Sequence, residues 1–198
     1  MAEMYDVSDF RNGLRILYEN EPFVVQYFQH VKPGKGNAFT RTKIKSLLTG
    51  RTLEPTFKSG DKVGKPDVEE RPMQFLYKEE GGSYIFMDSK SFDQVPLNED
   101  ALGDGKNSDD AVNFLKENID CHVMFYNGRP IGVTLPNAVD LKVIKCDPGV
   151  RGDTVSGAMK PATLESGYTL SVPLFINEGD VLKIDTRSGE YLTRVSTG

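Results

Sequence analysis

The chain has very few residues of the kinds that ligate metals or carry out nucleophilic catalysis. It contains two cysteines and two histidines among 198 residues. Cys121 and Cys146 are isolated thiols, so we expect reduced interior residues rather than a disulfide. His122 follows Cys121, and adjacent strand residues point to opposite faces, so the two cannot share a metal without help from elsewhere. His30 is the other histidine. We therefore expect no metal site, no cofactor and no Ser/His/Asp or Cys/His catalytic arrangement.

Long apolar segments are also missing. No apolar run approaches the length needed to span a bilayer, which predicts no membrane partner. The first residues, Met1 to Asp6, have neither a basic region nor an apolar region, so we expect no secretory signal and a cytoplasmic protein. Hydrophobic residues make up 38% and charged residues 27%, with 19 Gly and 11 Pro, a composition typical of a turn-rich β-protein without one large core.

Short runs of alternating apolar and polar residues predict strands throughout the chain. A turn at residues 60–66 places a first boundary near Lys65, and the chain restarts after Pro136, so we predict domains at 1–65, 66–136 and 137–198. In the middle domain we expect Asn98 to cap one short helical turn and Ser108 a second, and one helix interposed late among strands is the pattern of an OB-like barrel. The predicted strands are residues 13–18, 23–31, 40–45, 51–57, 73–77, 84–87, 121–126, 130–133, 139–144, 170–176, 181–184 and 191–195. The aromatic residues with the strand spacing of core positions are Phe23, Tyr27, Phe75, Tyr77, Tyr84, Phe86, Phe125 and Phe175.

The segment from Lys32 to Phe39 lies between two predicted strands and reads as the tip of a hairpin. Pro33 and Gly34 predict a type II turn in which Gly34 takes the positive φ, leaving Lys35 at the apex. Gly34 and Gly36 carry no Cβ, so the backbone beside Lys35 is slim enough to enter a narrow cavity. The plainer interpretation is a solvated turn with an exposed lysine.

Basic residues follow the tip along one face of the next strand. Arg41, Lys43 and Lys45 alternate with uncharged residues, so they share a face, and Lys32 and Lys35 continue the positive charge to the tip. The chain carries a net charge of −5, yet residues 1–65 have eleven Lys/Arg against seven Asp/Glu, a balance of +4. This pattern favours contact with an RNA phosphate backbone.

The segment from Lys32 to Gly50 resembles the modified-lysine loop of the bacterial elongation factor P family. The far end of the chain resembles that family's C-terminal signature in order and spacing, so the resemblance covers nearly the whole chain. The loop from Leu97 to Asp110 is longer than the family pattern. The C-terminal residues concerned are Lys160–Thr163, Gly167, Val172–Phe175 and Asp185–Tyr191.

The resemblance implies an all-β fold: an SH3-like (KOW-type) domain and two OB-fold domains in an elongated, tRNA-like outline. It implies a monomeric translation factor, not an enzyme, that binds the ribosome beside the P-site peptidyl-tRNA. Lys35, extended by a modifying enzyme with β-lysine or another group, would reach the acceptor end of that tRNA and help peptide bonds form at consecutive prolines.

Two further loops carry motif-like sequences. Arg151, Gly152, Asp153 and Thr154 resemble the family's third-domain loop, which the resemblance implies faces mRNA and tRNA, although a plain turn is the alternative. Gly103 to Asn107 has the glycines and lysine of a phosphate loop. Position 100 is Asp where the first glycine belongs, and Asn107 replaces the Ser/Thr that binds magnesium, so we interpret this segment as a solvated loop.

Two other functions remain open from the residues alone. An enzyme could use Lys35 as an amine nucleophile, but such lysines are activated by burial or a neighbouring cation, and a glycine-flanked apex offers no burial. The chain could instead be a generic OB-type RNA-binding protein, or an elongation factor P-like paralogue with a different task. The intact Pro33-Gly34-Lys35-Gly36 tip favours the factor itself.

Overall fold

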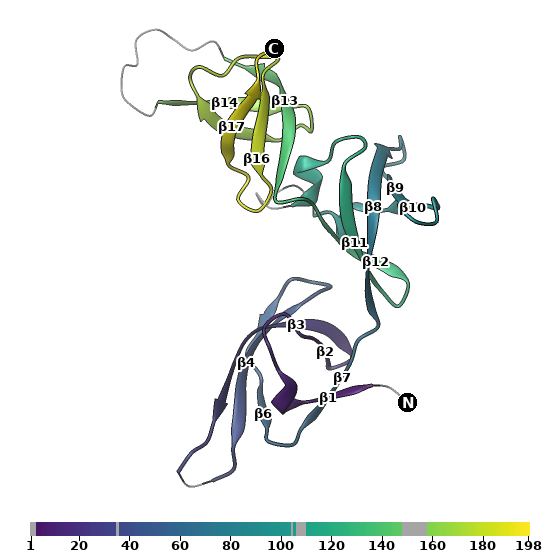
Figure 1. Ribbon diagram of the computed structural model, residues 1–198, viewed down its shortest axis with the longest axis vertical. Helices are drawn as coiled ribbons and strands as arrows, with labels where there is room; N and C mark the ends of the chain where they lie inside the picture. The colour runs from purple at the N-terminus through teal and green to yellow at the C-terminus, as the bar shows by residue number, and fades with distance from the viewer. Residues whose placement is uncertain (1–2, 35, 104, 106–109, 148–157) are drawn as a thin grey trace. The chain divides into compact units, whose positions relative to one another are not determined.

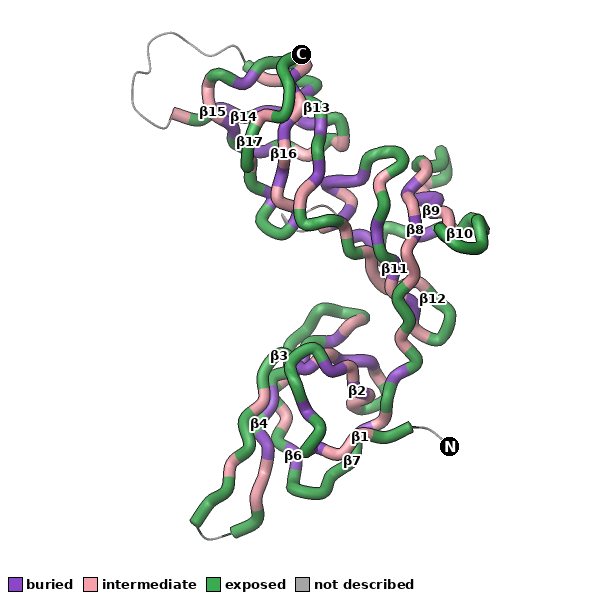
Figure 2. Tube along the Cα trace, viewed as in Figure 1, coloured by how far each residue is buried: buried purple, intermediate pink, exposed green. Residues whose placement is uncertain are grey.

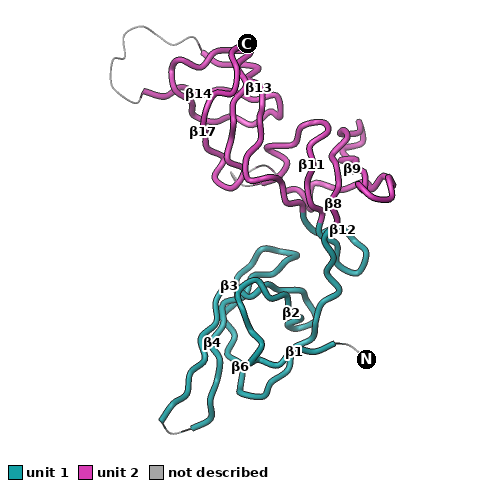
Figure 3. The backbone as a smooth tube through the Cα atoms, in the orientation of Figure 1, with its two compact units in different colours: residues 1–70, 124–132 teal, residues 71–123, 133–198 magenta. Residues whose placement is uncertain are grey.

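The computed structural model describes residues 3–34, 36–103, 105, 110–147 and 158–198, and these residues form three β-sheets, with short 3-10 turns between some strands of the first and second sheets (Figure 1). The all-β prediction is confirmed. The chain divides into two compact units, residues 1–70 with 124–132 and residues 71–123 with 133–198 (Figure 3). The three-domain division at residues 65 and 136 stays a prediction. Within the described ranges no helix is long and apolar enough to cross a membrane.

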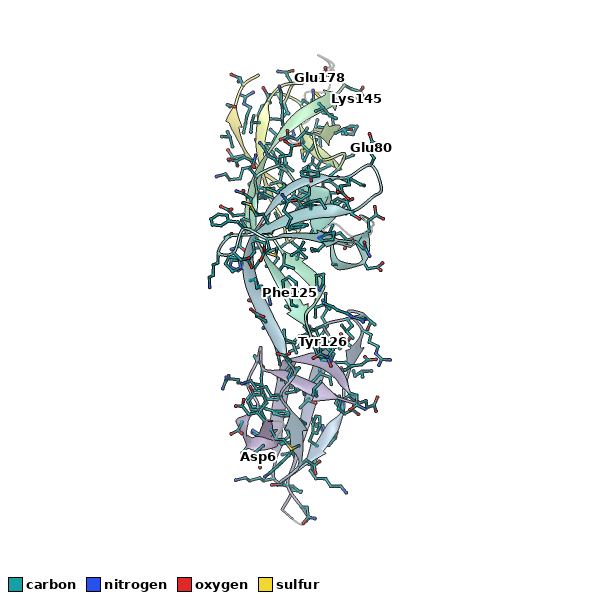
Figure 4. The ribbon with its side chains drawn as sticks, turned by 90° about the vertical axis from the view of Figure 1, so that its right-hand side faces the viewer. Asp6, Glu80, Phe125, Tyr126, Lys145 and Glu178 are labelled. Carbon is teal, nitrogen blue, oxygen red and sulfur yellow. The ribbon has the colours of Figure 1, made fainter. Side chains whose placement is uncertain are left out.

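The first sheet has the strand order β1-β7-β2-β3-β4-β5, with β6 also paired to β4. The core of this sheet includes four fully buried side chains, those of Ile16, Phe23, Val25 and Ile44. The 3-10 turn η1 (Val7–Asp9) is capped by Asp6, which is labelled in Figure 4. The strands are β1 (Met4–Asp6), β2 (Arg15–Tyr18), β3 (Glu21–Val31), β4 (Phe39–Ser46), β5 (Thr52–Leu53), β6 (Thr56–Lys58) and β7 (Lys62–Gly64).

The segment predicted as a turn at residues 60–66 contains strand β7, so the prediction is wrong for residues 62–64. The alternation is too short to be recognised in the sequence, because β7 has three residues and only Val63 is buried. Its pairing with β1 and β2 supplies the missing signal. The turn between β2 and β3 is tight: Glu19 and Asn20 both have positive φ, and Tyr18 pairs directly with Glu21.

The second sheet has the order β10-β9-β8-β11-β12. Its β11–β12 connection is the predicted Asn127-Gly128 turn, in which both residues have positive φ. Phe75 and Phe86 pack with ring centroids 5.2 Å apart in its interior. The elements are β8 (Val68–Lys78), β9 (Tyr84–Asp88), β10 (Gln94–Leu97), η2 (Glu99–Ala101), η3 (Ala111–Phe114), β11 (Asp120–Tyr126) and β12 (Arg129–Thr134).

The third sheet has the order β15-β14-β13-β16-β17 and its own apolar core. Phe114, at the end of η3, packs into this core and lies edge-to-face with Tyr168 at 5.3 Å. Strand β14 was not expected from the sequence. The strands are β13 (Ala138–Cys146), β14 (Met159–Leu164), β15 (Thr169–Pro173), β16 (Val181–Asp185) and β17 (Tyr191–Ser196).

The cysteines follow the sequence expectation of reduced thiols. Cys121 is buried and Cys146 half-buried, and both are free. Burial raises the pKa of the Cys121 thiol to about 12, so it stays protonated near neutral pH. A thiol of this kind is an interior packing residue with little reactivity.

Candidate RNA-binding finger

Strands β3 and β4 form a long antiparallel hairpin, which we call the finger. Their register runs from Phe23 opposite Ser46 to Val31 opposite Phe39. The connecting loop covers residues 32–38, and the hairpin extends beyond the other strands of its own sheet (Figure 1). A hairpin of this length places its loop well away from the core of the first sheet.

Buried threonines hold the finger to its sheet. Thr40 and Thr42 are 3% and 4% exposed, and each has a hydrogen-bond partner. Thr40 Oγ1 lies 2.8 Å from Nδ1 of His30 across the strand pair. The Thr42 hydroxyl donates to the Pro55 carbonyl oxygen at 2.8 Å. Because satisfied buried polar groups restrict the backbone to one arrangement, β4 has a defined orientation up to the loop.

The base of the loop is pinned by the neighbouring strand β6. The Ser59 N–H donates to the carbonyl oxygen of Ala38 at 3.0 Å, and Lys58 lies opposite Phe39 in the register. The Arg41 guanidinium lies 5.6 Å from the centre of the Phe39 ring, a cation–π contact along one face of β4. These contacts fix where the loop leaves the sheet.

At the tip, Lys32, Pro33, Gly34 and Gly36 are all exposed, while Lys35 lies outside the described residues. The predicted type II turn is wrong: the positive φ, 112°, belongs to Gly36 and not to Gly34. The reason is loop length. Seven residues separate Val31 from Phe39, so the chain reverses over the whole loop and needs no tight turn at Pro33-Gly34.

The predicted basic stripe lies on one solvent-exposed face of β4. Arg41, Lys43 and Lys45 are exposed, whereas the residues between them, Thr42 and Ile44, are buried (Figure 2). The geometry expected from strand alternation is therefore present. That these side chains bind RNA stays a prediction.

Lys58 belongs to the same face, which the sequence alone did not predict. Directly paired residues of neighbouring strands share a face, and Lys58 pairs with Phe39 two residues before Arg41. The Thr56-Phe57-Lys58 alternation around a buried Phe57 was the available signal. Only the pairing of β6 with β4 could place this lysine beside the stripe.

Tyr27 was predicted to be a core residue, and the structure corrects this. A β-bulge lies between Val25 and Tyr27: Val25 pairs with Ile44 and Tyr27 pairs with Lys43, so Gln26 is an extra residue. The bulge reverses the alternation, placing Phe28 against the core and leaving Tyr27 53% exposed. Tyr77 and Phe175, also predicted as core, are 42% and 56% exposed. The other aromatics assigned to the core, Phe23, Phe75, Tyr84, Phe86 and Phe125, are buried.

Other candidate segments contribute less to the site. Arg151, Gly152, Asp153 and Thr154 lie outside the described residues, so their role stays a prediction. In the long 97–110 loop, Asn98 begins η2 without a side-chain cap, and Leu102 is buried. Ser108, expected to cap the second helical turn, lies outside the described residues, and Asp110 precedes η3. Among the described residues no group of three or more His, Cys, Asp and Glu side chains could hold a metal ion.

Comparison with known proteins shows which family the chain resembles. Three family models match: "Elongation factor P (EF-P) KOW-like domain" at residues 6–63, "Elongation factor P (EF-P) OB domain" at 68–133, and "Elongation factor P, C-terminal" at 139–194. The chain is 52% identical to elongation factor P of Bdellovibrio bacteriovorus over 98% of this chain and 99% of that one. It is 48% identical to that of Desulforapulum autotrophicum over 98% and 100%.

A solved structure supports the fold alone. The protein titled "Eukaryotic translation initiation factor 5A from Methanococcus jannaschii" superposes with a TM-score of 0.54 at 18% identity, covering 68% of this chain and 93% of that one. With its KOW-like and OB domains, the chain is a protein-synthesis factor of the all-β class. It belongs to the elongation factor P family.

Proposed function

We propose that the chain is a translation elongation factor that binds the ribosome beside the P-site peptidyl-tRNA and stimulates peptide bond formation at consecutive prolines. A post-translationally extended Lys35, most simply with a β-lysyl group, is the working residue. In this proposal the chain acts in the cytoplasm, as a monomer, with a lysine-modifying enzyme as a further partner.

One observation carries the proposal: the finger. The family models match residues 6–63, 68–133 and 139–194, and the Lys35 loop connects the two strands of a long hairpin that is held by the hydrogen bonds of two buried threonines. The exposed face of β4 adds positive charge toward the loop. A rigid arm with a cationic approach and slim flanks suits a side chain that must enter an RNA-lined cavity.

Orientation supplies the acceleration in this mechanism. Proline is a constrained reactant, and its ring limits the geometries in which its nitrogen can attack the peptidyl ester. Positioning the peptidyl-tRNA removes part of the entropic barrier to bond formation, and the factor itself transfers no proton. The extended lysine lengthens the reach of the finger while keeping positive charge for phosphate oxygens.

The alternative in which Lys35 acts as an enzymatic nucleophile finds no support in its surroundings. The described flanks, from Lys32 to Gly34 and from Gly36 to Asn37, are all exposed. A nucleophilic lysine needs a desolvated pocket or a close cation to lower its pKa. The same variants that test the translation role also test this one, because an enzyme would turn over a carbonyl substrate without the ribosome.

Lys35→Ala tests the proposal directly. We expect the variant to lose the rescue of a Pro-Pro-Pro reporter in reconstituted translation, while thermal stability changes by no more than about 0.5 kcal/mol, since an exposed loop side chain carries little folding energy. Lys90→Ala is the matched control, because Lys90 is an exposed turn lysine of the second sheet. If Lys35→Ala supports Pro-Pro-Pro synthesis as well as the modified, unaltered chain, the mechanism is wrong.

The state of Lys35 is measured separately. Intact mass of the natively expressed chain, followed by peptide mapping across residues 31–41, shows whether the lysine carries an added group and what its mass is. A reporter without proline runs completes the design. We expect its synthesis to be nearly normal with every variant, because ordinary residues need no help with positioning.

A further inference from the structure

The side chain of Tyr27 points outward, which the sequence did not predict. It places an exposed aromatic ring on the basic face of the finger. Tyr27 is 53% exposed and pairs directly with Lys43. Gln29, two residues along β3, pairs with Arg41 on the same face. Lys43 therefore lies beside the ring across the strand pair, and Arg41 lies on the same face two residues nearer the tip of the finger.

Between Glu21, which begins β3, and Glu54, which follows β5, the charge along the two strands is of one sign. Residues 22–53, which contain all of β4 and nearly all of β3, include no Asp or Glu. Surfaces that bind single-stranded RNA combine aromatic rings with cations, since a base stacks on the ring while the phosphates pair with the cations. A protein partner of acidic character would use the cations and leave the ring without a matching surface.

We infer that Tyr27 is a stacking site for an unpaired RNA base, with Arg41 and Lys43 holding the flanking phosphates. The inference rests on the proposed function, because it assigns a specific contact to the RNA-facing surface of the finger. The β-bulge at Gln26 is the structural device that makes the site. Without the extra residue, Tyr27 would share the buried face of Phe23 and Val25.

Two RNA probes distinguish stacking on a base from pairing with phosphate charges. One is a single-stranded RNA of about ten nucleotides, and the other is the same strand with abasic residues, which keeps the phosphates and removes every base. We expect Tyr27→Ala to weaken binding of the intact strand by about five-fold or more and to leave binding of the abasic strand unchanged. Tyr27→Phe keeps the ring and should bind both strands as the unaltered chain does.

Tyr77→Ala is the matched control, because Tyr77 is an exposed strand tyrosine, 42% exposed, in the second sheet. It should leave both affinities unchanged, and equal thermal midpoints should show that all the variants fold. The inference is overturned if Tyr27→Ala binds the intact strand normally, if it loses both strands equally, or if the unaltered chain binds neither. This outcome is independent of the Lys35→Ala reporter assay, so either proposal can fail without the other.

Discussion

Gly36, and not Gly34, is the glycine that the tip of the finger requires. Its φ of 112° lies in a region that side chains with a Cβ rarely adopt, and its neighbour Lys35 is the proposed working residue. Gly34 has no such φ, and a Cβ added there meets nothing within 4 Å. The two glycines look equivalent in the sequence, but only one has a backbone conformation that depends on the missing side chain.

We therefore expect Gly36→Ala to impair Pro-Pro-Pro synthesis more than Gly34→Ala, which thickens the tip without straining the backbone. The alanine at 36 costs about 1–3 kcal/mol if the loop keeps its shape, so the loop rearranges or the chain loses stability. The reporter assay and the thermal midpoint, measured on both variants, distinguish these routes. Equal activity of the two variants would show that the tip does not depend on this backbone conformation.

At the scale of elements, the turn from Asp185 to Tyr191 explains part of the C-terminal signature as structure. The Asp185 carboxylate accepts from the Arg187 side chain at 2.6 and 3.1 Å and from the Arg187 backbone N–H at 2.8 Å. The Gly189 N–H donates to the Asp185 carbonyl oxygen at 2.8 Å, which closes the turn between β16 and β17. These residues shape a hairpin and need no ligand to account for them.

The same turn predicts a pH dependence. The Arg187 side chain, with the backbone N–H groups, lowers the pKa of Asp185 from 3.8 to about 2. A carboxyl whose pKa is lower in the folded state stabilises the fold above its unfolded pKa, and this contribution is lost as the pH falls from about 4 to about 2. Asp185→Asn should lower the thermal midpoint at neutral pH, and the difference from the unaltered chain should shrink as the pH falls below about 4 and be small at pH 2.

Thermal unfolding followed from about pH 7 to pH 2 measures this effect. Asp67→Asn, at an exposed aspartate, is the control and should track the unaltered chain throughout. A constant difference between Asp185→Asn and the unaltered chain across the whole range would mean that the ion pair with Arg187 contributes nothing. The exposed setting of this turn predicts a small effect that is screened by salt.

At the scale of the whole molecule, charge is unevenly distributed. The net charge is −5, while residues 1–65 carry +4 and the remainder −9. An acidic chain can still bind a polyanion when its cations gather on one face, as they do on the finger, and the acidic remainder limits non-specific adhesion. The measurable consequence is the dependence of ribosome affinity on salt.

Charge reversal of Arg41 and Lys43 together should weaken ribosome binding at low salt. The slope of log affinity against log salt should become shallower, because roughly two fewer counterions are released on binding. The pair Lys90→Glu and Lys142→Glu changes the net charge equally at exposed positions outside the finger, so it serves as the control. The relevant comparison is the slope, measured at several salt concentrations. A slope unchanged in the finger variant, or changed equally in the control, would contradict the role of the stripe.

Much of the architecture was determined by the sequence itself. Alternation of apolar and polar residues is a local signal, so it predicted the all-β fold, most strands and the common face of Arg41, Lys43 and Lys45. The Asn127-Gly128 turn was equally local, because its backbone conformation depends on those two residues. The family resemblance was confirmed for the same reason: its motifs are stretches of consecutive residues.

Only the tertiary structure decided features that depend on pairing between distant segments. Strand β7 is too short to be predicted from its own sequence, and its strand conformation depends on pairing with β1 and β2. Lys58 joins the basic face only through the pairing of β6 with β4. A bulge shifts the register against β4 and turns Tyr27 outward, although its spacing from Phe23 and Val25 indicates a core residue. Register is a property of two strands together, so neither strand's sequence contains it alone.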